Sequence, residues 1–447
     1  MDLIKPFRAV RYQLAESGDL GDLVAPPYDV IGGDLQKALF KRSPHNVIRL
    51  ILPETRSDDG EGENKYTRAA RLFQDWLKRG VLARDSEPAI YRYQISFSLK
   101  TPEGIVTRER PGFVALCKLH EYPERKILPH ERTLAGPKQD RFQLMLHCRA
   151  HFSQVFLLYP DEEGALEKAL GQAPPAGTWS LSCEDDDGVT HTVWPVTAPE
   201  AIAAVNHHLH DRRLYIADGH HRYETALALR RELLSRSPLF AEGVDYALAY
   251  FTPLEHPGLT IFPYHRLVHN LPKRRLSGLL KKLGRHFIVD RTLLSPLESG
   301  PPRREFMMGL AERGRAGTVF GMVDAGTRCA YYLTLKPDSP LKHECRTEAE
   351  LAQAELDVVA LEELVLTGTL GIKRKDLLNE KFIAYETDYD RVLTAVQKPP
   401  CQLAFLMNPT SVHEVIKVAD LAGIMPEKST YFFPKLASGL LFNLMEE

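Results

Sequence analysis

The sequence lacks the features that would place it quickly in a specialised class of protein. Its six cysteines include no CxxC pair, which argues against a zinc site or a disulfide framework and is typical of reduced thiols. No apolar run approaches the about 18 residues that a membrane span requires. The opening residues, MDLIKPFRAV, contain no stretch apolar enough for a signal peptide. We therefore expect a cytoplasmic protein with no membrane partner.

An excess of charge of one sign is also missing. The chain has 57 Lys and Arg against 59 Asp and Glu, which gives a formal net charge of −2 over 447 residues. No global field attracts nucleic acid at this balance, so we expect no nucleic-acid partner. Hydrophobic residues make up 44% of the chain, which is enough for a sizeable core and excludes a disordered protein.

Short apolar runs of the strand type alternate with helix-type patterns along most of the chain. This alternation predicts a mixed α/β or α+β protein. The predicted strands are 47–53, 91–97, 113–119, 155–159, 214–217, 246–251, 318–323, 330–335 and 403–407. The predicted helices are 65–79, 140–151, 221–235, 276–287, 347–366 and 412–422.

Three polar stretches are predicted to connect these elements. The segments 56–64 (RSDDGEGEN) and 184–188 (EDDDG) are acidic and glycine-bearing, as exposed loops are. The segment 295–304 (SPLESGPPRR) is predicted to be a linker, because two consecutive prolines interrupt regular structure. We expect an N-terminal portion at 1–111, a core at 112–270 and a C-terminal α+β lobe at 271–447.

The segment LYIADGHHRYETAL (214–227) concentrates polar chemistry at one predicted strand-to-helix junction. Gly219 permits a sharp turn that brings backbone N–H groups close to a ligand, and a helix N-terminus suits a phosphate. Arg222 can add a bidentate contact to phosphate oxygens. Asp218 can ligate Mg²⁺ or accept a proton from a hydroxyl, and His220 and His221 can donate to phosphate or carry a proton.

A purely structural interpretation of this segment is also available. Asp218 can cap the helix, with the histidines hydrogen-bonded locally. Five consecutive polar residues between an apolar strand and an amphipathic helix nevertheless favour a functional site.

A second polar constellation lies upstream in ILPHERTLAGPKQDRF (127–142). Glu131 can act as a general base, and Lys138 and Arg141 can hold phosphates. A solvated charged loop explains the same residues when they are considered alone.

Smaller candidates for the edge of a pocket are scattered along the chain. A rigid double proline precedes Tyr28 and Asp29, and His265 and Arg266 follow a predicted strand end. Lys435 lies among aromatic residues near the C-terminus. His130 belongs to the upstream constellation. A metal cluster formed by His207, His208, His210, Asp211 and His220 has only weak support from its spacing.

Motifs along nearly the whole chain resemble the bacterial and archaeal family known as domain of unknown function 1015. The matching pieces are APPYDVI (25–31), NVIRL (46–50), HERTLAGPKQDR (130–141), YIADGHHRYETA (215–226), PYHRLV (263–268) and KSTYFFPKLASGL (428–440). The family name specifies no activity.

Two motifs are similar to those of the ParB/sulfiredoxin superfamily, especially of its ADP-dependent free-serine kinases. They are PHE (129–131) before a predicted helix, and DGHHR (218–222) between a predicted strand and a predicted helix. The resemblance implies that Glu131 and Asp218 activate a hydroxyl, and that Gly219, His220, His221 and Arg222 cradle nucleotide phosphates with Mg²⁺. It also implies a ParB-like core, with an insertion at about 160–212 that lengthens the interval between the two carboxylates. No cysteine lies between Leu214 and Tyr246, which argues against sulfiredoxin chemistry.

These observations favour a Mg²⁺-dependent phosphotransferase that moves a phosphoryl group between a nucleotide (ADP or ATP) and a small hydroxy compound such as serine. One alternative is a phosphatase that acts on a small phosphomonoester such as phosphoserine, in which water replaces the hydroxy acceptor and Asp218 or Glu131 positions it. Another is a nucleotide-binding or sensing module without turnover. The direction of reaction and the oligomeric state stay open.

Overall fold

The computed structural model describes residues 2–101, 104–133, 135–236, 241–292 and 296–445. The chain forms two compact units. Unit 1 comprises Met1–Pro129, Thr133–Thr260 and Pro434–Glu447, and unit 2 comprises His130–Arg132 and Ile261–Phe433. The predicted portion 1–111 thus lies in the same unit as most of the predicted core, and the end of the chain returns to that unit. Within the described residues, no helix combines the length and the apolar character needed to cross a bilayer.

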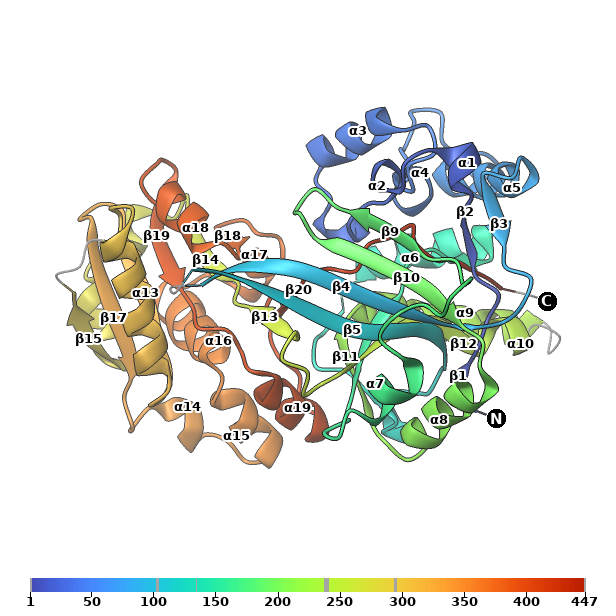
Figure 1. The fold of residues 1–447 in the computed structure, drawn as a ribbon. Coiled ribbons are helices and arrows are strands. Elements are labelled where there is room, and N and C mark those ends of the chain that lie inside the picture. Colours follow the sequence, from blue (N-terminus) through green and yellow to red (C-terminus); the bar gives the residue numbers. More distant parts are fainter. Residues whose placement is uncertain (1, 102–103, 134, 237–240, 293–295, 446–447) are drawn as a thin grey trace. The chain divides into compact units, whose positions relative to one another are not determined.

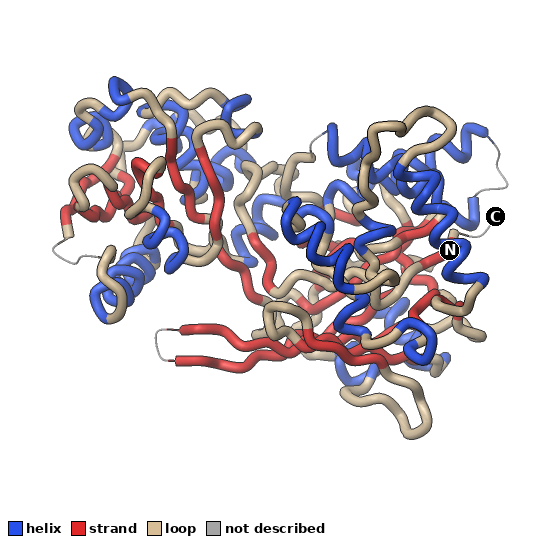
Figure 2. The backbone as a smooth tube through the Cα atoms, turned by 90° about the horizontal axis from the view of Figure 1, so that it is seen from above, coloured by secondary structure: helices blue, strands red, loops and turns tan. Residues whose placement is uncertain are grey.

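Unit 1 is built on a mixed sheet of nine strands (Figures 1 and 2). In spatial order these are β6 (Ile127–Leu128), β11 (Leu214–Asp218), β8 (Val155–Tyr159), β12 (Tyr246–Pro253), β5 (Gly104–Lys118), β4 (Ile90–Thr101), β10 (Thr190–Val196) and β9 (Leu181–Glu184), with β1 (Ile4–Lys5) paired to β5. The pairs β6–β11 and β8–β12 are parallel, and the other pairs are antiparallel. The mixed α+β fold predicted from the sequence is confirmed.

Helices and two small strand pairs complete unit 1. The longer helices are α3 (Gly33–Arg42), α5 (Lys65–Lys78), α6 (Ala135–Cys148), α8 (Pro199–Leu209) and α9 (His220–Arg236). The shorter ones are α1 (Leu14–Ser17), α2 (Leu20–Leu23), η1 (Tyr28–Val30), α4 (Ile48–Ile51), η2 (Tyr122–Glu124), α7 (Ala165–Leu170) and α10 (Ala241–Val244). The strand pairs are β2 (Val10–Tyr12) with β3 (Leu82–Arg84), and β7 (Ala150–His151) with β21 (Asn443–Leu444).

The segment 160–212, predicted to be an insertion, contains α7 and α8, which pack into the core, and β9 and β10, which form one edge of this sheet.

Unit 2 has its own antiparallel sheet of six strands (Figure 1). The order is β15 (Phe287–Arg291), β17 (Cys329–Leu335), β16 (Val319–Asp324), β19 (Cys401–Leu406), β14 (His265–His269) and β18 (Ile383–Glu386). β13 (Thr260–Phe262) pairs with β20 (Tyr431–Phe433). The helices are α11 (Lys273–Leu276), α12 (Leu279–Leu283), α13 (Pro301–Gly314), α14 (Pro340–His343), α15 (Glu348–Ala354), α16 (Asp357–Ala360), the π-helix η4 (Leu361–Thr369), α17 (Arg374–Leu378), α18 (Tyr389–Ala395) and α19 (Val412–Asp420).

Two predictions of local structure are wrong. The predicted strand 47–53 contains the short helix α4, whose Ile48, Leu50 and Ile51 are buried. A short apolar run of this kind fits a buried helix as well as a buried strand. The predicted linker 295–304 instead contains the start of α13, because Pro301 and Pro302 occupy the first helical turn, where proline's missing N–H has no helical partner to lose. Residue 295 lies outside the described residues.

Two predicted helices are present only in part. The segment 347–366 is divided into α15, α16 and η4, and Leu356 between the first two has extended backbone angles. The segment 276–287 contains α12, which ends at Leu283, and the last residue of the segment, Phe287, is the first residue of β15.

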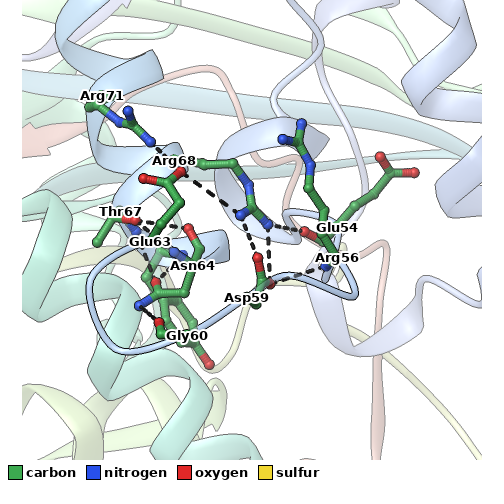
Figure 3. Close-up of polar contacts among 10 residues, drawn as sticks. Glu54, Arg56, Asp59, Gly60, Glu63, Asn64, Thr67, Arg68 and Arg71 are labelled. Carbon is green, nitrogen blue, oxygen red and sulfur yellow. Dashed lines mark hydrogen bonds and ion pairs between the residues drawn. The ribbon is translucent and has the colours of Figure 1, made fainter.

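The acidic segment 56–64 is a loop, as predicted, and it is tied to the start of α5 (Figure 3). Arg68 of α5 pairs with Asp59 of the loop and donates to the carbonyl of Glu54. Asn64 caps α5 by accepting from the backbone N–H of Tyr66 at 2.9 Å. The first turn of α5 then directs Lys65 and Tyr66 onto Asp140 of α6, at 2.6 and 2.9 Å.

Candidate functional site

The predicted strand-to-helix junction forms as expected, since β11 ends at Asp218 and α9 begins at His220. Between them Gly219 has φ +88°, a left-handed conformation that suits glycine. A Cβ at this position would lie only 2.9 Å from Nε of Arg222. The turn therefore depends on glycine for two reasons, the backbone angle and the close approach of the arginine side chain.

Asp218 lies between two cations within unit 1. Its Oδ1 is 2.6 Å from Nζ of Lys435, and its Oδ2 is 2.6 Å from Nη2 of Arg222. The three side chains are 18%, 11% and 10% exposed, respectively. The sequence predicts Lys435 only at the edge of a pocket, whereas the structure places it against the central carboxylate.

These two cations determine the protonation state of Asp218. Burial alone would raise its pKa, but the charges of Lys435 and Arg222 outweigh burial and hold the pKa well below its usual range. Asp218 is therefore an anion at physiological pH.

Arg222 makes a further contact inside unit 1. Its Nη1 donates to the backbone carbonyl of Gln154, at the position just before β8. The guanidinium is thus held at both ends by the protein, which fixes its orientation. Its predicted contact with phosphate remains a prediction.

His221 lies among charges on the first turn of α9. Burial is the main cause of its lowered pKa; Asp29 and Glu224 oppose the decrease, and Lys138 and Arg222 add to it. A lowered pKa leaves the imidazole neutral at pH 7, so one ring nitrogen can donate a hydrogen bond while the other accepts one. Asp29 is exposed.

Lys138 of α6 and Glu224 of α9 form an ion pair with 2.9 Å between Nζ and Oε2. Thr133 Oγ1 donates to the same carboxylate oxygen at 2.6 Å. A pocket of about 750 Å³ opens beside this pair, with Tyr122, Phe142 and Leu227 among its apolar lining and Arg231 among its polar lining. Glu224 was not singled out in the sequence, and its spacing of one helical turn from His220 was the available signal.

Arg141, also on α6, stacks its guanidinium 4.1 Å from the ring centroid of Tyr28. Arg141 also pairs with Asp140 and donates to the carbonyl of Ile51. Burial raises the pKa of Tyr28 to about 12. Tyr28, Arg141 and Arg222 line one small cavity of about 40 Å³, so three of the predicted site residues come together.

The candidates His130, Glu131, His265 and Arg266 lie in unit 2. Glu131 accepts a hydrogen bond from the backbone N–H of Lys428 at 3.4 Å. His130 is buried, with its Nε2 3.2 Å from Oγ1 of Thr430. Because Glu131 and Asp218 belong to different units, their predicted joint site remains a prediction.

His265 and Arg266 are buried on β14. Burial lowers the pKa of His265 to about 3, and its Nδ1 accepts from the backbone N–H of Met407. His265 is therefore a neutral histidine with a structural hydrogen bond. Arg266 donates to the carbonyl oxygens of Tyr264 and Lys428.

The structure gives little support for a metal site built from side chains alone. Among the described residues, no group of three or more His, Cys, Asp or Glu side chains is placed to hold a metal ion. Both carboxylate oxygens of Asp218 already have cationic partners. The residues present therefore fit a Mg²⁺ ion only if it is held mainly by the phosphates of a bound nucleotide.

Comparisons with known proteins agree with the motif resemblance. A family model described as "Protein of unknown function (DUF1015)" matches residues 4–359. No curated protein matches the chain.

Among solved structures, a free serine kinase in complex with AMP is similar at 11% identity and TM-score 0.35, over 71% of this chain and 88% of that one. A conserved hypothetical protein from Pyrococcus furiosus is similar at 11% identity and TM-score 0.34, over 71% and 92% of the two chains. SbnI from Staphylococcus aureus, with a C-terminal truncation, has 12% identity and TM-score 0.35, over 74% and 87%. Similarity at this level does not transfer an activity.

Proposed function

The chain belongs to the DUF1015 family, and we propose that its unit 1 carries a phosphotransferase site that uses a nucleotide. In this proposal a phosphoryl group passes between the nucleotide and a small hydroxy compound such as serine. The phosphorus–oxygen bond to the nucleotide breaks, a new bond forms to the hydroxyl oxygen, and the hydroxyl proton passes to Asp218.

The observation that carries the proposal is the arrangement of Asp218 between Lys435 and Arg222 at the start of α9. Two cations face one carboxylate, so one positive charge is left over. The N-terminus of α9 adds partial positive charge from its free N–H groups. A phosphate group is the ligand that such a site favours.

A strongly lowered pKa makes Asp218 a weak base, yet it suits this reaction. Phosphoryl transfer proceeds in most analyses through a loose transition state, in which the attacking hydroxyl is still largely protonated. The carboxylate then orients the hydroxyl and takes the proton late. Lys435, 2.6 Å from Asp218, is placed to neutralise the charge of the phosphoryl group during transfer.

The pocket of about 750 Å³ along α6 and α9 is the place we propose for the rest of the nucleotide. Tyr122 and Phe142 offer aromatic surface for a base, and Lys138 offers a cation near the phosphate end. His221 would donate from its neutral ring, and Gly219 and His220 would present backbone N–H groups. Arg141 completes the cationic side through the cavity that it shares with Arg222. A Mg²⁺ ion carried by the phosphates would supply further charge neutralisation.

Glu131 is the second proposed catalytic carboxylate, on the basis of the motif resemblance alone. Asp29, Tyr28, His130, His265 and Arg266 are proposed only as surroundings of the sites in their own units. Buried His265 and Arg266 already have backbone partners.

The direct test is phosphoryl transfer by the full chain, followed by ³¹P NMR, with ADP or ATP, Mg²⁺ and a panel of hydroxy compounds that includes serine. We expect Asp218→Asn to lower turnover by about two or more orders of magnitude, a usual loss for a missing acid–base group. The matched control is Asp161→Asn. Asp161 is also a buried carboxylate at a helix start, where it accepts from the backbone N–H of Ala165 and Leu166 of α7.

Each outcome separates the candidate functions. Release of phosphate from a phosphomonoester without nucleotide would indicate a phosphatase. Nucleotide binding with no transfer to any member of the panel would indicate a binding module. Full activity in Asp218→Asn would refute the catalytic role of this residue.

A further inference from the structure

Unit 2 contains a charged cavity that the proposed function does not use. It measures about 120 Å³ and lies against η4, α17 and β18. Its polar lining consists of Arg132, Glu362, Arg374, Glu380, Tyr385, Glu427 and Lys428. An engineered cavity of about 150 Å³ holds one benzene molecule, so this space encloses only part of an amino-acid-sized compound, and the rest of the compound would lie at the exposed rim.

Unusual backbone converges on this cavity from three segments of the chain. Glu362 lies in the nine-residue π-helix η4, a rare conformation that often occurs at functional sites. Glu380 and Lys428 have φ of +51° and +58°, in the left-handed region that side-chain-bearing residues seldom adopt. Uncommon conformations of this kind persist where the surrounding structure holds them, and they cluster at ligand sites.

The inner part of the cavity is acidic. Glu362 and Glu427 are only partly exposed, and burial raises the pKa of each of them. Among the residues that the structure describes, neither carboxylate has a hydrogen bond or ion pair partner. Nearby cations, Arg374 for Glu362 and Lys428 for Glu427, only partly offset burial, so both carboxylates still favour a positively charged hydrogen-bond donor.

Buried Arg266 contacts two residues of the cavity lining. Tyr385 faces the cavity, and the buried guanidinium of Arg266 lies 5.6 Å from its ring centroid. The same guanidinium donates to the backbone carbonyl of Lys428 at 3.1 Å, which helps to hold Lys428 in its left-handed conformation.

The outer part of the cavity has the opposite charge. Arg132 and Arg374 are exposed, and Lys428 is half-buried. With Glu380, the cavity lining has three carboxylates and three cations, and Arg132 and Arg374 are the exposed cations at its rim. A matching ligand carries one cationic group at its inner end and two anionic groups at its outer end.

We propose that this cavity binds a small amino compound with two acid groups, of the acidic amino acid class. The ammonium group lies between Glu362 and Glu427, and the acid groups face Arg132, Arg374 and Lys428. The site belongs to unit 2 alone and does not depend on the proposed phosphoryl transfer.

The test is isothermal titration of the full chain, without nucleotide, using L-glutamate and L-aspartate as probes. Glutarate lacks the ammonium group, putrescine lacks the acid groups, and glycine has only one acid group. We expect at least one acidic amino acid to bind about tenfold or more tightly than all three analogues, as the loss of one charged hydrogen bond predicts.

Matched variants locate the binding. Glu362→Gln should weaken it by about tenfold or more, whereas Glu363→Gln, at the exposed neighbour on the same helix, should leave it unchanged. Arg374→Gln and the exposed neighbour Lys375→Gln form a second pair at the rim, and this pair still decides the question if Glu362→Gln fails to fold. Asp218→Asn should bind the probe normally, which separates this site from the site in unit 1.

Three results would overturn the proposal. They are the absence of binding by either acidic amino acid at millimolar concentration, equal binding of glutarate, and equal effects of the variants within both matched pairs.

Discussion

One partly buried carboxylate of unit 1 and two of unit 2 are in opposite situations. Asp218 in unit 1 has a cation 2.6 Å from each oxygen, and its pKa is held well below the usual range. Glu362 and Glu427 in unit 2 have no ion pair among the described residues, and burial raises their pKa. A carboxylate with counter-ions is complete within the protein, whereas an unpaired one is best satisfied by a ligand. A carboxylate group therefore stabilises unit 1 where it is paired and destabilises unit 2 where it is not.

The largest change in the free energy of unfolding should come from removing a cation of unit 1. Lys435→Met leaves Asp218 with Arg222 alone, and breaking a buried pair costs about 3 kcal/mol or more of unfolding free energy. Urea unfolding can be followed by tryptophan fluorescence, since Trp76, Trp179 and Trp194 are the chain's three tryptophans and all lie in unit 1. Lys100→Met, at an exposed position of β4, is the control and should change the unfolding free energy little. Equal effects of the two variants would mean that the pair is not important for stability.

The next largest loss of unfolding free energy should come from changing the turn at Gly219, which lies between Asp218 and Arg222. Gly219→Ala places a Cβ 2.9 Å from Nε of Arg222 and forces alanine to adopt φ +88°. We expect a loss of about 2 kcal/mol from the unfavourable backbone angle and the clash together. Gly171→Ala tests the backbone angle alone, because its φ is +73° and no atom lies within 4 Å of the added Cβ. The same urea experiment should show a smaller loss for Gly171→Ala, of about 1 kcal/mol.

Acid should weaken unit 1 through Asp218. The pKa of Asp218 in the folded state is below that in the unfolded state, so its stabilisation is present at neutral pH. It is lost as the pH falls below the unfolded value of about 4 and through the folded value. The fluorescence-detected unfolding free energy, measured between neutral pH and pH of about 3, should therefore fall more steeply for the wild type than for Asp218→Asn. Parallel curves for the two proteins would contradict this assignment.

The smallest change in stability is expected in unit 2, and it should be a gain and not a loss. Glu362→Gln removes a charge whose burial is only partly offset by Arg374 and Arg266, so we expect unit 2 to become more stable by about 0.5 kcal/mol at pH 7. Hydrogen exchange in peptides from β16 and β19 measures this change in unit 2. Exposed Glu363→Gln should have no effect there. A destabilised Glu362→Gln would show that a partner inside the protein already satisfies the carboxylate.

Elements with clear periodicity and local end signals could be predicted from the sequence. The strand β8 spans the predicted 155–159, and α5 begins at the predicted Lys65, after its Asn64 cap. The segment 47–53 could not be assigned correctly, because its apolar residues are buried all round in α4 and show no alternation. Pro301 and Pro302 were misassigned since proline suits both a linker and the first turn of a helix.

The candidate site follows the same division between local and long-range information. The sequence by itself determined the strand, the glycine turn and the helix around Asp218, because these depend on backbone preferences over a few residues. Only the tertiary structure decided that Lys435, 217 positions along the chain, neutralises that carboxylate. It alone also brought Glu362, Glu427 and their outer cations to one cavity. No local pattern encodes such pairs, because burial and the packing of distant segments select which charges meet.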